Sequence, residues 1–225
     1  MKYSIIIFLL LVILQPSFAQ RKKKQKEDVS VSVLEKNASQ RLLIEGLSDL
    51  VNDRIASASD KFNAAVVKEP ANDASWFELA KIYGDQNDYV KALECIDKAI
   101  NLQENNVWYR LLQMKIYEAS AQYKEMLVCA ENLVQLKPDN PEFLFELANA
   151  QLINHQNNEA AKTLDKIEEI VGVIEEVSMQ KQQIYIAQKQ YDKAVNEIEK
   201  LIEMNPAESS RYLAIIAEIY NKSGN

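Results

Sequence analysis

Apolar and small residues recur along the chain with a period of 34 residues, beginning at Ser39. Counted from the start of each repeat, the eighth and twentieth positions are mostly small, and the twenty-fourth and twenty-seventh are apolar. Positions three residues apart lie on one face of a helix, so the last two positions define a buried stripe. Pro70, Pro138 and Pro206 stand at the thirty-second position of their repeats, where each would stop a helix. The pattern predicts two helices in every repeat.

These four positions, called the seam positions below, hold a consistent set of side chains. From the first repeat to the fifth, the eighth position holds Gly46, Ala80, Met114, Ala148 and Gln182, the twentieth Ala58, Ala92, Met126, Ala160 and Ala194, the twenty-fourth Phe62, Ile96, Ala130, Leu164 and Ile198, and the twenty-seventh Ala65, Ala99, Leu133, Ile167 and Leu201. Small residues let two helices approach closely. One hairpin cannot bury its apolar face alone, so neighbouring hairpins are expected to stack.

This pattern resembles the tetratricopeptide repeat family. The second repeat carries the resemblance best, through Trp76, Leu79, Ala80, Tyr83, Tyr89, Ala92, Ile96 and Ala99. The resemblance implies an all-α fold, a right-handed α-solenoid of stacked helical hairpins over 39–225, with repeats at 39–72, 73–106, 107–140, 141–174 and 175–208 and a partial sixth at 209–225. The first helices of the third repeat (Arg110, Gln113, Met114) and of the fifth (Ser178, Lys181, Gln182) depart from the family's preferred residues.

The segment before the repeats has the layout of an export signal. A charged start, an apolar run from Ile5 to Leu14 and the small residues Ser17 and Ala19 predict a signal peptide over 1–19, cut after Ala19. The alternative is an uncleaved membrane anchor, because more positive charge follows the run than precedes it. Residues 20–38 are expected to form a basic flexible linker, whose possible contact with a membrane surface uses five cations: Arg21, Lys22, Lys23, Lys24 and Lys26.

Net charge bears on the class of partner. The chain carries a formal charge of −7, and from Glu27 onward 20 basic residues face 33 acidic ones. Nucleic-acid binding needs a basic surface, so an acidic body of this kind argues against it. The four glycines are too far apart to form a phosphate-binding loop, and the sequence predicts no cofactor.

Residues that could carry catalysis or bind metal are few. His155, the single histidine, falls in the predicted turn of the fourth repeat and has no partners of fixed spacing. Cys95 and Cys129 are 34 residues apart, so they occupy equivalent positions of neighbouring second helices. Packed helices lie about 8–10 Å apart, which exceeds the Cα separation of a disulfide. Free, partly buried thiols are expected, although export leaves a bond open. The chain is predicted not to be an enzyme.

The resemblance also implies a binding surface. In this family the second, fifth, ninth, twelfth and thirteenth positions of each repeat face a groove lined by the first helices. The fifth positions form an apolar stripe that begins with Leu43, and the candidate groove residues are Phe77, Lys81, Trp108, Leu111, Lys115, Phe145, Asn149, Met179 and Gln183. Such a stripe suits an extended or helical peptide. The alternative is that it packs one hairpin on the next, and Trp108 and Phe145 favour the groove.

Three functions follow as hypotheses. The first is a non-catalytic scaffold of the bacterial cell envelope that binds a partner peptide or helix in the groove. The second is the N-terminal module of a longer enzyme or sensor, because the sixth repeat is incomplete and its expected helix, 210–221, is apolar nearly all round. The third is an adaptor for a membrane or cell-wall surface. The sequence does not identify the partner.

Overall fold

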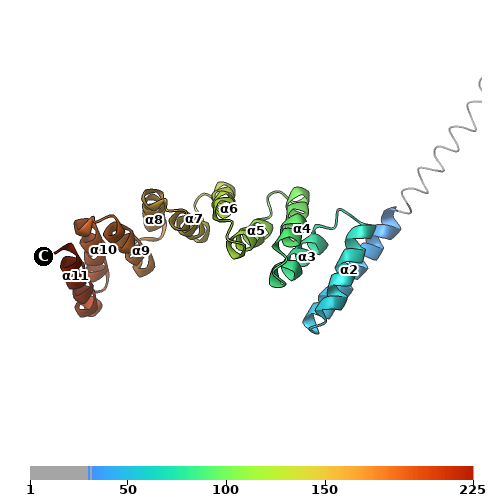
Figure 1. Cartoon of the computed structure of the whole chain (residues 1–225), viewed down its shortest axis with the longest axis horizontal. Coiled ribbons are helices and arrows are strands. Elements are labelled where there is room, and N and C mark those ends of the chain that lie inside the picture. Colours follow the sequence, from blue (N-terminus) through green and yellow to red (C-terminus); the bar gives the residue numbers. More distant parts are fainter. Residues whose placement is uncertain (1–29, 31, 225) are drawn as a thin grey trace, which may run out of the picture. The chain divides into compact units, whose positions relative to one another are not determined.

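The computed structural model describes residues 30 and 32–224, and in that part of the chain it contains helices and no strand (Figure 1). Residues 32–51 form the N-terminal helix. It is followed by α2 (Ile55–Lys68), α3 (Asp73–Asp85), α4 (Tyr89–Leu102), α5 (Val107–Ala119), α6 (Tyr123–Leu136), α7 (Pro141–Ile153), α8 (Asn157–Val171), α9 (Glu175–Ala187), α10 (Tyr191–Met204), a 3-10 turn (Pro206–Glu208) and α11 (Ser209–Ser223). The all-α helical-repeat fold is confirmed.

The chain divides into two compact bodies, Met1–Glu104 and Asn105–Asn225. The N-terminal body holds the first two repeats, as the N-terminal helix with α2 and as α3 with α4. The C-terminal body holds three hairpins, α5 with α6, α7 with α8 and α9 with α10, and the single helix α11. In each body the second helix of one repeat also contacts the first helix of the next, so the hairpins stack.

The 34-residue register predicted the helix starts. Asp73, Val107, Pro141 and Glu175, the predicted starts of repeats two to five, are the first residues of α3, α5, α7 and α9. The reason is local for three of them, because the preceding residue is an asparagine whose side-chain oxygen accepts a backbone N–H of the first turn. These N-caps are Asn72, Asn106 and Asn140.

The N-terminal helix departs from the expected boundary. It is already helical at residue 32, seven residues before the predicted start at Ser39, so the expected linker 20–38 is wrong for 32–38. Leu34, Glu35 and Lys36 are good helix formers and are exposed, so propensity rather than burial extends this helix. The predicted signal peptide and the five cations of the linker lie outside the described residues.

The turn inside every hairpin has the same backbone geometry. The fifteenth residue of each repeat has a φ between 56° and 60°, and these residues are Asp53, Asn87, Ala121, His155 and Lys189. In the third repeat, Ala121 N–H donates to Glu118 O at 3.0 Å and Gln122 N–H donates to Tyr117 O at 2.8 Å. This pair of bonds is a Schellman motif, which closes the C-terminus of the first helix. His155 therefore lies in an exposed turn, as predicted.

All twenty seam positions are buried, which confirms the predicted interior of the hairpins. Within one repeat, the side chains at these positions differ in size in a complementary way. In the first repeat, Gly46 faces Phe62, and an ideal Cβ on the glycine would lie 2.5 Å from the ring. In the third repeat, Met114 and Met126 pack in one cluster with the small Ala130. A large residue on one helix is thus matched by a small residue on the other, as close packing requires.

The last helix, α11, buries Tyr212 and Ile219 against α10 and leaves Leu213 and Tyr220 exposed. The prediction that this helix is apolar on both its buried and its outer faces is therefore confirmed. No helix among the described residues is long and apolar enough to cross a membrane.

The contact between Gly46 and Phe62 gives a stability prediction. Gly46→Ala improves helix propensity but places a methyl group inside van der Waals range of a fully buried ring. Overpacking of this kind costs about 1–3 kcal/mol, so the free energy of unfolding in urea should fall. Adding Phe62→Leu reproduces the Ala148 and Leu164 pair of the fourth repeat and should recover most of the loss. If the double variant loses as much stability as Gly46→Ala alone, or more, Gly46 and Phe62 are not packed against each other in this way.

The positive φ at Ala121 gives a second prediction. A non-glycine residue in the left-handed region is strained, so Ala121→Gly should raise the free energy of unfolding by about 0.5–1 kcal/mol. The matched control is Ala119→Gly in the last turn of α5, which should lower it by a similar amount. Chemical denaturation of the three chains measures both changes. A loss in both variants would show that the turn carries no strain.

Candidate functional site

The first helices of the C-terminal body carry seven of the nine predicted groove residues. Leu111, Phe145 and Met179, at the fifth positions of α5, α7 and α9, are half-buried. Each packs against a buried cluster that includes residues of the next first helix. Part of each side chain therefore packs one hairpin on the next, which is the alternative to a role in the groove. The rest of each side chain remains accessible to a ligand.

The flanking positions are more open. Lys115, Asn149 and Gln183, at the ninth positions, are exposed. Trp108, at the second position of α5, is 69% exposed and its indole is the largest exposed ring of the C-terminal body. An exposed tryptophan beside half-buried apolar side chains is a typical anchor for a partner.

Helix α11 adds residues that the sequence analysis did not select. Leu213, Ala217 and Tyr220 stand at the fifth, ninth and twelfth positions of the sixth repeat, and all three are exposed. The same 34-residue register would have found them. We call the surface formed by the second, fifth, ninth and twelfth positions of α5, α7, α9 and α11 the first-helix face.

Acidic residues accompany this face. Glu142 and Glu176, at second positions, are exposed. Glu146 lies next to Phe145 in sequence, and its pKa is raised, first by burial and then by the charge of Glu118, while Lys115 opposes the shift. A partly desolvated carboxylate gains from a nearby cation. The first-helix face therefore combines apolar side chains with negative charge.

In the N-terminal body, Phe77 and Lys81 are neighbours on α3. The Lys81 ammonium lies 5.4 Å from the centre of the Phe77 ring, and it donates to Glu78 at 2.8 Å. Both side chains are half-buried. Their partners hold them in place on the surface of α3, where the resemblance predicts the groove.

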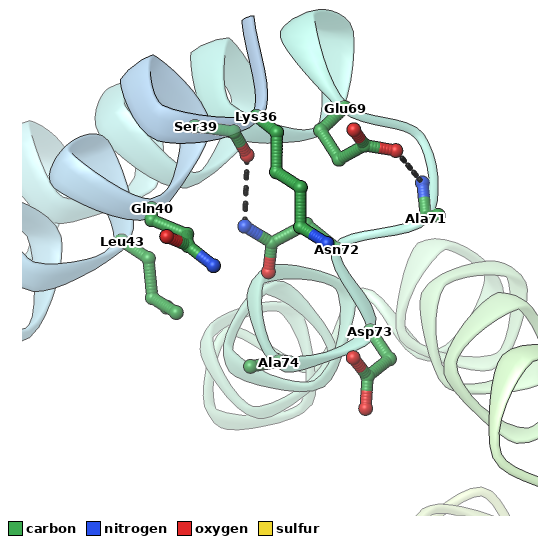
Figure 2. A pocket seen from close by; sticks show the side chains of 9 residues that line it. All are labelled: Lys36, Ser39, Gln40, Leu43, Glu69, Ala71, Asn72, Asp73 and Ala74. Atoms are coloured by element: carbon green, nitrogen blue, oxygen red, sulfur yellow. Dashed lines mark hydrogen bonds between the residues drawn. The ribbon is translucent and has the colours of Figure 1, made fainter. Parts of the chain in front are cut away.

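A pocket of about 360 Å³ opens in the N-terminal body, between the N-terminal helix and the start of α3 (Figure 2). Gln40 and Leu43 hold the second and fifth positions of the first repeat, and Ala74 holds the second position of the next. The full lining is Lys36, Ser39, Gln40, Leu43, Glu69, Ala71, Asn72, Asp73 and Ala74. Predicted groove positions thus line a real concavity in this body.

The wall of this pocket is ordered by hydrogen bonds. Ser39 Oγ donates to Ala65 O at 2.9 Å, and Asn72 Nδ2 donates to Ser39 Oγ at 2.8 Å (Figure 2 shows the second bond). Asn72 Oδ1 also accepts from Ser75 N–H at 3.0 Å. Because one asparagine both caps α3 and holds Ser39, the pocket shape is coupled to the start of that helix.

The fifth repeat contains a buried ionic cluster that the sequence analysis noted only as a departure from the family. Lys181 stands at the seventh position of its repeat, where the second and fourth repeats have Leu79 and Leu147, and its side chain is 2% exposed. Its ammonium lies 2.6 Å from Asp165, 2.8 Å from Glu168 and 2.9 Å from Glu197, so each of its three hydrogens has a carboxylate acceptor. Lys200 completes the cluster, at 2.9 Å from Glu168 and 3.2 Å from Glu197.

The ionic cluster links α8 to α9 and α10, the two helices of the fifth repeat. The ion pairs shift the pKa values of Lys181 and Glu168. Burial lowers the pKa of Lys181, but the hydrogen bonds that its ammonium donates to Asp165, Glu168 and Glu197 outweigh burial and raise it. Burial raises the pKa of Glu168, yet the bonds from Lys181 and Lys200 leave it lowered overall. Lys181 and Glu168 are therefore both ionised at neutral pH. The sequence contained a signal for this cluster. Lys181 occupies a predicted interior position, and Asp165 and Glu168 are one helical turn apart on the preceding helix.

The remaining chemical candidates are the two cysteines. Cys95 and Cys129 are buried and are not joined by a disulfide. Burial raises the pKa of the Cys95 thiol to about 11, so it is a poor nucleophile at neutral pH. Within the described residues, no group of three or more His, Cys, Asp or Glu side chains could hold a metal ion.

Comparison with protein families identifies two repeats directly. Models described as "Tetratricopeptide repeat" match residues 74–106 and 183–208. The first match coincides with the second repeat, where the resemblance was strongest, and the second covers most of the fifth. No curated protein sequence matches the chain.

Solved structures with the same fold are distant in sequence. A tetratricopeptide repeat protein from Parabacteroides merdae has a TM-score of 0.66 at 19% identity, covering 84% of this chain and 74% of that one. A MamA protein has a TM-score of 0.65 at 13% identity, with coverage of 77% and 94%. YrrB, described as a tetratricopeptide repeat protein with an unusual peptide-binding site, has a TM-score of 0.61 at 14% identity, with coverage of 73% and 85%.

The ionic cluster leads to a prediction about stability and pH. Lys181→Met leaves two nearly buried carboxylates short of a cation, so it should cost about 3 kcal/mol or more at pH 7. The Glu168 pKa is lowered from 4.5, so its contribution is complete above that value and is lost as the pH falls through the folded pKa. The gap in unfolding free energy between wild type and Lys181→Met should therefore shrink at about pH 3.

The control for this experiment is Lys162→Met, which removes an exposed pair with Glu159. It should change the free energy of unfolding by less than about 1 kcal/mol at either pH. A gap for Lys181→Met that stays constant from neutral to acid pH would show that lost packing, and not charge, explains its effect.

Proposed function

We propose that this chain, a tetratricopeptide repeat protein, is a non-catalytic scaffold that binds a peptide or helical segment of another protein on its first-helix face. The observation that carries the proposal is the fifth-position stripe of the C-terminal body. Leu111, Phe145 and Met179 are fixed by packing on one side and accessible on the other. A pre-ordered apolar surface loses little side-chain entropy when a ligand binds.

The side chains of the first-helix face indicate which kind of peptide it would bind. Apolar contacts at Trp108, Phe145 and Leu213 suit side chains that recur on one side of a peptide or helix. The carboxylates of Glu142, Glu146 and Glu176, and the exposed amides of the ninth positions, suit a segment with Lys or Arg between its apolar residues. The fold relative YrrB, described as having a peptide-binding site, supports the class of ligand but not its sequence.

We also propose that this scaffold works in the bacterial cell envelope. The support is the sequence of residues 1–19, whose charged start, apolar run and small-residue end follow the layout of an export signal. Export would place the repeats outside the cytoplasm, where their partners would be other exported or membrane-attached proteins.

A peptide selection with matched variants tests the binding face. Peptides are selected from a displayed random library against the full chain, and their affinities are measured by fluorescence anisotropy. Trp108→Ala and Phe145→Ala should each weaken binding by about tenfold or more, since an anchor residue contributes upwards of 1 kcal/mol. Val128→Ala, which removes an exposed apolar side chain from the second helix α6, should leave the affinity unchanged.

Two results would contradict the proposal. One is a set of selected peptides that bind the Trp108 and Phe145 variants as tightly as the parent chain. The other is a loss of affinity in Val128→Ala alone, which would move the binding surface to the second helices.

A further inference from the structure

The connection between α8 and α9, residues 172–174, differs from the earlier connections between repeats. The connections that lead into α3, α5 and α7 each end in an asparagine whose side chain caps the next helix. The connection into α9 ends at Ile174, which makes no side-chain cap bond. Pro70 and Pro138 restrict the backbone of two earlier connections, whereas Gly172 stands at the same repeat position here. The α8–α9 connection therefore lacks the local interactions that fix its neighbours.

The backbone of Gly172 has a conformation that is open essentially to glycine alone. Its φ is 81° and its ψ is −175°. Apart from its chain neighbours, no atom of the described residues lies within 4 Å of the place that a Cβ would occupy. Packing around this residue therefore does not fix its dihedral angles. A change of φ or ψ at Gly172 would rotate α9 relative to α8 without a collision at the glycine itself.

The inner side of α9 is unusually polar. Its buried residues include Ser178, Lys181 and Gln182, and the equivalent positions of α7 hold Leu144, Leu147 and Ala148. The Ser178 hydroxyl is buried and has no hydrogen-bond partner among the described residues, which costs free energy. Val177 and Ile184 still pack in one apolar cluster with residues of α7 and α8. The apolar contribution to this junction is therefore smaller than a helix like α7 would give.

The ionic cluster supplies much of the remaining contact across the junction. Lys181 on α9 lies 2.6 Å from Asp165 and 2.8 Å from Glu168 on α8, and Lys200 on α10 lies 2.9 Å from Glu168. The attraction between buried charges is largely offset by the cost of removing them from water. If α9 rotates away from α8, the pairs separate and water solvates the charges again. Closed and open conformations of the junction would then differ little in free energy, as a hinge requires.

We propose that the α8–α9 connection is a hinge at Gly172 and that the ionic cluster holds it in the conformation described here. Phe145 on α7 and Met179 on α9 lie on opposite sides of this hinge. Opening it would change the spacing of these two positions on the first-helix face, so a ligand that spans both would favour one conformation. The hinge itself does not rest on the proposed binding of a peptide.

Distances between spin labels test the hinge in the full chain, with Cys95→Ala and Cys129→Ala to remove the native thiols. One chain carries labels at Asn149→Cys on α7 and Glu199→Cys on α10, two exposed sites on opposite sides of the connection. A control chain carries them at Val128→Cys on α6 and Asn149→Cys, both before the connection.

Two variants are then compared by these distances. Lys181→Met removes the central cation, so the distribution between positions 149 and 199 should broaden and gain a second population, while the control distribution stays unchanged. Gly172→Ala keeps the cluster and has room for its methyl group, but alanine cannot hold the glycine conformation. The mean distance between positions 149 and 199 should therefore shift by several ångström.

Either variant can overturn the proposal. An unchanged distribution between positions 149 and 199 in Lys181→Met would show that the ionic cluster does not hold the junction. An unchanged distance in Gly172→Ala would show that the connection is not a hinge. If Lys181→Met broadens the control pair as well, packing is lost throughout the C-terminal body, and Gly172→Ala decides the question alone.

Discussion

The close approach of two helices inside each hairpin is the constraint on which the rest of the structure depends. At the seam positions the two helices share a fixed volume, and each repeat fills it with a different set of residues. Gly46 accommodates Phe62, whereas Met114 and Met126 belong to one buried cluster with the small Ala130. Because the helices cannot move apart without opening a cavity, a change on one side requires a change on the other.

This constraint assigns roles to the other positions. The seam uses the eighth position of the first helix and three positions of the second, so the second, fifth, ninth and twelfth positions of the first helix are not needed to close the hairpin. The fifth position packs partly on the neighbouring repeat and remains partly accessible, as Phe145 illustrates. In α5, α7 and α9 the ninth and second positions are exposed. The same 34-residue repeat therefore determines both the buried positions and the accessible positions that could contact a partner.

The register and the seam could be predicted from the sequence because both depend on local periodicity. The capping asparagines and the five left-handed turn residues follow the same period, although only His155 was placed in a turn beforehand. The first seven residues of the N-terminal helix, 32–38, were assigned to the linker because they are nearly all exposed and no apolar period marks the start of the helix. The Lys181 cluster was missed because it joins acids from two repeats, and a single-helix pattern does not show which charges meet.

The most direct test of the binding face is photocross-linking of a selected peptide to the chain. A photoreactive side chain is placed at Asn149, an exposed ninth position of α7, and in a second chain at Val128 on α6. If the first helices form the binding surface, the peptide is captured from position 149 and not from position 128. Capture from position 128 alone would place the ligand on the second helices and contradict the account.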